Sequence, residues 1–133
     1  MIKPIKLTGN YEGDYATEYL VNFSINVRVC HQFSSLSLNS GKYEAYLSKF
    51  YTFLPDFDYF REDLERNGIN YLLGEENSPS NHKPRYRVRI YDLNFIRKLF
   101  SSVNLNQLDE RKVKKIDFMK RVWKRNFQNH LYS

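Results

Sequence analysis

The stretch Leu7-Thr8-Gly9-Asn10-Tyr11-Glu12-Gly13-Asp14 decides how the fold of the whole chain is interpreted. Gly, Asn and Asp crowd together there, and local chemistry therefore favours a loop. Gly9 and Gly13 lie four residues apart, however, so on a helix they share one face. A face without side chains lets a second helix approach closely, which offsets the roughly 1 kcal/mol lost at each internal glycine. The alternative to the loop is thus a helix from about Pro4 to Gly13, with Thr8, Gly9 and Gly13 as its pairing interface and Asp14 at its C-terminal end.

Composition and charge limit the classes of protein to consider. A length of 133 residues suits a single domain, and an aromatic fraction of 17% argues against disorder. The net charge of +6 suits an anionic partner such as nucleic acid or an acidic membrane surface. We expect no membrane span and no signal peptide. Cys30 is the only cysteine, so a reducing, intracellular or organellar compartment is expected. The sequence contains no zinc-spaced Cys/His cluster and no phosphate-binding glycine loop.

Val21 to Cys30 alternates apolar and polar residues over ten positions, which predicts a strand. Its apolar residues point to the core, and its polar face is formed by Asn22, Ser24, Asn26 and Arg28. Such a face is usually solvated. Asparagine and arginine side chains also hydrogen-bond to base edges and phosphates, so the sequence leaves both interpretations open.

Arg85 to Tyr91 is the second well-patterned strand. Its core side carries Tyr86, Val88 and Ile90, and its other side carries Arg85, Arg87, Arg89 and Tyr91. Three arginines on one face repel one another unless something anionic lies against them. One interpretation is a solvated edge strand that charge protects from aggregation. The other is a nucleic-acid surface, to which Lys83 and Arg28 add charge of the same sign.

The remaining elements follow from aromatic runs, caps and helical spacing. We expect a strand over Tyr43–Phe53, a helix capped by Asp56 or Asp58 that ends before Gly68, and a strand over Ile69–Leu73. Helices are expected over Leu93–Phe100 and about Leu108–Phe127, the last with Asn106 as N-cap and Asp109 completing a capping box. The sequence thus predicts one α+β domain over residues 1–133, in the order α-β-β-α-β-β-α-α. Its four-stranded antiparallel sheet is covered by helices on one face.

Leu7 to Tyr15 resembles the signature of the LAGLIDADG homing endonucleases and maturases. The direct matches are Leu7, Gly9 and Asp14. The substitutions of similar kind are Thr8 and Gly13 for small residues, Tyr11 for an apolar residue and Glu12 for the first acid. The expected order of elements, and a final helix that contains Lys114-Lys115-Ile116-Asp117-Phe118, extend the resemblance over most of the chain.

The resemblance implies a partner and a chemistry. Members of the family pair two motif helices, so this single-motif chain needs a second such helix from a homodimer or a partner chain. Their sheets form a saddle over DNA, and the acids that end the two helices hold a divalent metal for strand cleavage. The resemblance therefore makes Asp14 the candidate catalytic acid and Mg²⁺ ligand, with Glu12 beside it.

Departures from the family pattern make catalysis doubtful. Asn10 replaces an apolar residue and Tyr15 the closing glycine, while Pro55 and Tyr91-Asp92 stand where polar and basic helpers are expected. We therefore expect a nucleic-acid-binding domain that no longer cleaves, acting as an RNA-binding or structural component of an organellar ribonucleoprotein. A maturase-like factor and a mitochondrial ribosome subunit are examples. An active Mg²⁺-dependent homing endonuclease is the alternative, and a third is an interaction protein in which residues 8–14 form a loop.

Overall fold

A computed structural model of the chain describes residues 11–30, 42–77 and 84–132. The helices of these ranges are α1 (Tyr11–Asn22), α3 (Asp58–Arg66), α4 (Leu93–Ser102) and α5 (Glu110–Tyr132), with two short 3₁₀ turns, η1 (Leu54–Phe57) and η2 (Leu105–Gln107). The strands are β1 (Ser24–Cys30), β2 (Lys42–Tyr51), β3 (Leu72–Asn77) and β4 (Pro84–Ile90).

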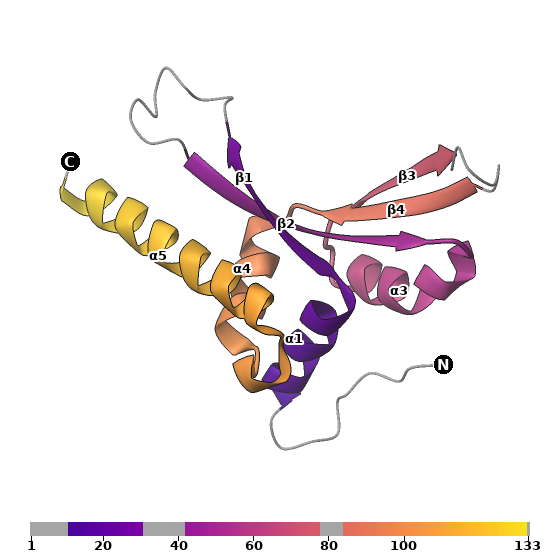
Figure 1. Cartoon of the computed structure of the whole chain (residues 1–133), viewed down its shortest axis with the longest axis horizontal. Helices are drawn as coiled ribbons and strands as arrows, with labels where there is room; N and C mark the ends of the chain where they lie inside the picture. Colours follow the sequence, from indigo (N-terminus) through magenta and orange to yellow (C-terminus); the bar gives the residue numbers. More distant parts are fainter. Residues whose placement is uncertain (1–10, 31–41, 78–83, 133) are drawn as a thin grey trace.

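The four strands form one antiparallel sheet in the order β1-β2-β4-β3. Figure 1 shows the four helices on the same side of this sheet. The α+β class, the antiparallel four-stranded sheet and the coverage of a single face are therefore confirmed. Because β4 lies between β2 and β3, it is an inner strand with a hydrogen-bonded neighbour on each side.

The core lies between the helices and the odd-numbered residues of β1 and β2. Ile25 and Leu47 are buried there, and Val88 and Ile90 of β4 join them. Tyr19 of α1 is the centre of an aromatic cluster, with ring centroids 5.8 Å from Phe23, 4.8 Å from Phe60 and 5.1 Å from Phe95. Offset and edge-to-face ring pairs at such distances add stability beyond the burial of their area. The aromatic cluster therefore joins α1 to both α3 and α4.

The end of the first helix and the start of the first strand were predicted wrongly. The helix does not end near Gly13, because α1 continues to Asn22, and β1 begins at Ser24 rather than at Val21. Ala16, Tyr19 and Leu20 are buried at helical spacing, whereas Val21 is 51% exposed. Burial of the helical face has thus prevailed over the strand-like alternation. Residues 4–10 of the predicted helix lie outside the described ranges.

Lys112 of α5 caps the C-terminal end of α1. Its ammonium donates hydrogen bonds to the carbonyl oxygens of Leu20 (2.6 Å), Val21 (3.1 Å) and Phe23 (3.1 Å). The last carbonyls of a helix lack partners within the helix, and a cation also complements the negative end of the helix dipole. Burial lowers the pKa of Lys112, and nearby Asp109 acts in the opposite direction. Lys112 thus provides a hydrogen-bond donor for the backbone carbonyl oxygens at the turn from α1 into β1.

The other boundaries agree in part with the predictions. Gly68 ends α3 with φ of 69°, as expected for a C-cap glycine, but neither Asp56 nor Asp58 caps the helix, whose N-cap Phe57 has no side-chain bond. The third strand runs over Leu72–Asn77 rather than Ile69–Leu73, because its register with β4 continues to Asn77. Asp109, not Asn106, caps α5 by accepting from the Lys112 backbone N–H at 3.0 Å.

Within the described ranges, no helix combines the length and the apolar character needed to cross a membrane.

Replacing Lys112 by Met should lower the free energy of unfolding by about 1.5–3 kcal/mol, because three carbonyls would lose a charged donor. Urea denaturation measures the change. Lys114→Met is the matched control. Lys114 is exposed, and its 3.4 Å ion pair with Glu110 lies on the helix surface, where such pairs add little stability. The control should change stability by less than about 0.5 kcal/mol. Equal losses in the two variants would contradict the capping role.

Candidate nucleic-acid interface

The sheet face opposite the helices carries most of the residues predicted to bind nucleic acid. The pairing registers place the even-numbered residues of β1, β2 and β3 and the odd-numbered residues of β4 on this side. We call this surface the open sheet face, because no described helix covers it in Figure 1. Its residues are Ser24, Asn26, Arg28, Glu44, Tyr46, Ser48, Phe50, Leu72, Gly74, Glu76, Arg85, Arg87 and Arg89, with Tyr91 just beyond β4.

Arg28 is held at one end of the open sheet face. It forms an ion pair with Glu44, its cross-strand neighbour on β2. Its guanidinium carbon lies 5.2 Å from the ring centre of Tyr46 and 5.5 Å from that of Tyr91. The two tyrosines stack on each other with centroids 4.9 Å apart. Hydrogen bonding to Glu44 raises the pKa of Arg28, so the group remains a cation.

Phe50 lies beside the arginine row of β4. The guanidinium carbons of Arg85 and Arg87 are 4.2 Å and 5.2 Å from its ring centre. Glu76 of β3 is the nearby anion, 3.7 Å from Arg85 and 4.0 Å from Arg89. Arg87 differs from its neighbours, because its buried Nε has no hydrogen-bond partner among the described residues.

The structure gathers six of the eight predicted binding residues on one surface. Ser24, Asn26 and Arg28 on β1 face the same way as the three arginines of β4. Asn22 does not, because it lies on α1 and its amide donates to the Glu18 carbonyl oxygen at 2.7 Å. Lys83 lies outside the described residues. Tyr91 was predicted on the arginine side of its strand, but the two carboxylates, Glu44 and Glu76, and the rings of Tyr46 and Phe50 were not predicted on this face. For Glu44, Tyr46 and Phe50 the available signal was their spacing of two or four residues along the second strand.

The metal prediction assumed that Asp14 lies at the C-terminal end of the first helix, and the structure places it elsewhere. Asp14 lies in the first half of α1, and the residue at the C-terminal end is Asn22, next to the carbonyls that Lys112 caps. Glu12 lies further towards the N-terminus of α1, and its side chain is among those not described. Among the described residues, no group of three or more acidic, His or Cys side chains comes together as a metal site.

The helix-pairing interface is only partly visible. Thr8 and Gly9 lie outside the described ranges. Gly13 is buried, and its carbonyl oxygen accepts a hydrogen bond of 2.6 Å from the Thr17 hydroxyl. From Ala16 to Leu20 every residue of α1 is buried within this chain. That part of the helix has no free side for a second chain, and pairing through residues 8–13 remains a prediction.

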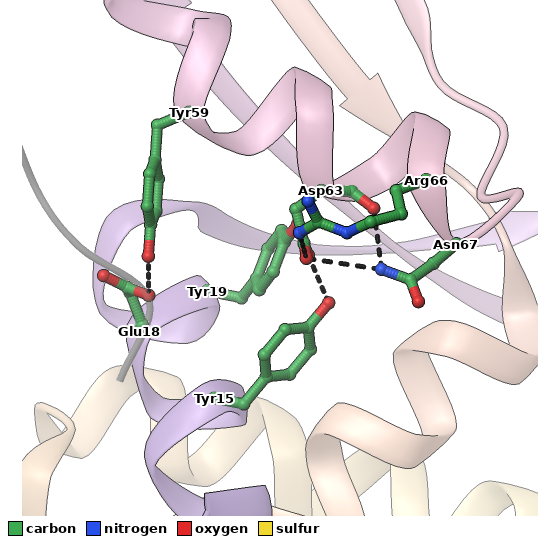
Figure 2. A network of polar contacts seen from close by, with 7 residues as sticks. All are labelled: Tyr15, Glu18, Tyr19, Tyr59, Asp63, Arg66 and Asn67. Atoms are coloured by element: carbon green, nitrogen blue, oxygen red, sulfur yellow. Dashed lines mark hydrogen bonds and ion pairs between the residues drawn. The ribbon is translucent and has the colours of Figure 1, made fainter. Parts of the chain in front are cut away.

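A second polar cluster joins α1 to α3 (Figure 2). One Asp63 carboxylate oxygen accepts hydrogen bonds from Tyr15 and from Tyr19 (2.7 Å), and the other accepts from Arg66 (3.0 Å) and Asn67 (3.3 Å). Glu18 accepts from the Tyr59 hydroxyl at 2.6 Å. All of these groups except Asn67 line an open pocket of about 820 Å³. Because both Asp63 oxygens already have donors, the cluster serves to hold α3 against α1.

The comparisons with known proteins leave the family open. No protein-family model, no curated protein and no solved structure matches this chain significantly. The LAGLIDADG resemblance therefore stays a prediction, and function has to be argued from the surfaces themselves.

Glu18→Gln should stabilise the protein at neutral pH and leave its stability nearly unchanged near pH 4. Burial raises the pKa of the Glu18 carboxyl above 4.5; the hydrogen bond from Tyr59 lowers it, and nearby Asp63 raises it. Between 4.5 and that raised value the native state keeps a proton that the unfolded state releases, so the free energy of unfolding falls as pH rises. Glutamine avoids this loss, which is about 1.4 kcal/mol for each pKa unit, and its carbonyl oxygen still accepts from Tyr59.

Urea denaturation at several pH values measures this difference. Glu62→Gln is the control, because Glu62 is exposed on α3, the helix that carries Tyr59, the partner of Glu18. A Glu18→Gln variant less stable than the parent at pH 7 would mean that the ionised carboxylate is favourable in the fold.

Proposed function

We propose that the chain binds nucleic acid through the open sheet face and does not cleave it. The observation that carries the proposal is the position of the arginine row. β4 pairs with β2 on one side and with β3 on the other, so it is not an edge strand. Protection of an exposed edge from aggregation therefore does not account for its three arginines. They lie across the middle of a face that no described helix covers.

The charges of this face favour an anionic ligand. Four arginines face only two carboxylates, Glu44 and Glu76, among its described side chains. Partly exposed ion pairs of this kind contribute about 0–1 kcal/mol each. A phosphate can therefore replace a carboxylate as the partner of Arg85 or Arg89 with little loss. The +6 charge of the whole chain adds long-range attraction.

The proposal leaves out strand cleavage for a reason of geometry. In the family that the sequence resembles, an acid ends the motif helix, whereas α1 ends at the amide Asn22. The ammonium of Lys112 already occupies the adjacent carbonyls. A cation at that point opposes a second, divalent cation by charge repulsion. An RNA-binding or structural role in an organellar ribonucleoprotein remains a prediction from the resemblance, as does the choice between RNA and DNA.

Changing Arg85, Arg87 and Arg89 together to Gln should weaken binding to a mixed-sequence oligonucleotide and flatten its salt dependence. Each phosphate contact contributes a slope of about 0.9 for duplex and 0.7 for single strands, so the slope should fall by roughly two to three units. Fluorescence anisotropy across a range of salt concentrations measures it. The fold should be retained, because Val88 and Ile90 carry the core side of β4.

The matched control removes the same charge from the helical layer by changing the exposed Lys98, Lys120 and Lys124 to Gln. Equal losses of affinity in the two triple variants would mean that binding depends on the total charge and not on the open sheet face, which would contradict the proposal. Site-specific, Mg²⁺-dependent cleavage of DNA that Asp14→Asn abolishes would instead establish the endonuclease alternative.

A further inference from the structure

We infer that the open sheet face takes single-stranded nucleic acid, with unpaired bases stacked on two aromatic–arginine platforms. This inference rests on the proposed function and specifies its ligand. The first platform is Arg28 with Tyr46 and Tyr91, and the second is Phe50 with Arg85 and Arg87. Aromatic rings and guanidinium planes are the groups on which proteins stack splayed-out bases.

In the Phe50 platform a large aromatic ring is exposed to solvent instead of packing in the core. β2 is an inner strand between β1 and β4, yet Phe50 is 43% exposed because it points to the open side. A base stacked there would remove this apolar area from water. Arg85, 46% exposed, lies 4.2 Å from the ring centre and offers either its outer plane or, once displaced, its charge to a phosphate.

The Arg28 platform is organised before any ligand binds. Glu44 and the two tyrosine rings hold the guanidinium in place while 55% of the side chain stays exposed. A side chain that is already ordered loses less entropy on binding. The same planar cation can stack on a base and pair with a phosphate.

The spacing of the platforms distinguishes a single strand from a duplex. Tyr46 and Phe50 lie four residues apart on β2, which separates them by about 14 Å at roughly 3.4 Å per residue. Successive nucleotides of one duplex strand rise by only about 3.4 Å. Bases that reach the two platforms must therefore be separated from each other, and only unpaired bases can splay in this way.

Polar groups occupy the space between the platforms. Ser48 of β2 lies opposite Arg89 of β4, and Asn26 of β1 donates to the Ser48 hydroxyl at 2.9 Å. Ser48 is only 5% exposed, so the groups that can meet a ligand there are the Asn26 amide and the Arg89 guanidinium, which can hydrogen-bond to the Watson–Crick edges of bases and to phosphates. A duplex hides those base edges, so this strip also favours single strands.

The test compares the binding of oligouridine, oligothymidine and a mixed-sequence duplex of equal length to the full chain by fluorescence anisotropy, with polyglutamate as an anionic competitor. The single strands should bind more tightly than the duplex. Phe50→Leu should weaken single-strand binding by roughly 5- to 150-fold, the equivalent of one lost base stack, and change duplex binding little. Phe53→Leu is the matched control, because Phe53 is 61% exposed beyond the end of β2.

Tyr91→Leu provides a second, independent variant at the other platform and should also weaken binding to single strands selectively. Urea denaturation verifies that each variant is folded. Tighter binding to duplex, with no effect of Phe50→Leu or Tyr91→Leu, would overturn the inference and leave the proposed function standing. Absence of binding to any of the three nucleic acids, or equally effective competition by polyglutamate, would overturn both.

Discussion

The fold depends on the burial of α1 between the sheet and the other helices. Tyr19 packs against aromatic rings from α3 and α4, and Asp63 accepts hydrogen bonds from two tyrosines of α1. Lys112 of α5 satisfies the carbonyls where the helix ends. The helices α3, α4 and α5 thus each contact α1, the first two through aromatic rings and the last through a charged hydrogen-bond donor. Since α1 lies on one side of the sheet, the described helices gather there and none of them covers the other side (Figure 1).

The charged and aromatic side chains of the open sheet face are partnered by one another when no ligand is bound. Glu44 and Glu76 lie among the arginines, while the rings of Tyr46, Phe50 and Tyr91 lie against guanidinium groups. Each of these rings has an arginine guanidinium over its face, where the electron-rich ring attracts the cation. The pairs are weak individually, and exchange of these contacts for phosphates and bases is therefore possible without unfolding.

The sequence predicted the elements better than it predicted the site. α4, α5 and β4 were placed within a few residues because Phe95, Ile96, Val88 and their neighbours follow a single clear period. Residues 21–23 fit both a helix and a strand, and the choice between them is made by Phe60 and Phe95, which are distant in the sequence. The platforms could not be foreseen, because Tyr46 meets Tyr91, and Phe50 meets Arg87, only through the pairing of β2 with β4. The prediction that Asp14 ends the first helix was wrong, because it relied on a short motif alone and α1 continues to Asn22.

Ultraviolet crosslinking of the chain to oligouridine, followed by mapping of the crosslinked peptides, tests the central claim most directly. The account predicts crosslinks at Tyr46 and Phe50 on β2 and at Tyr91 after β4, since excited bases react with the rings on which they stack. Crosslinks confined to the basic helix α5, or to Tyr59 and Tyr71 on the helical side, would contradict the assignment of the open sheet face as the nucleic-acid interface.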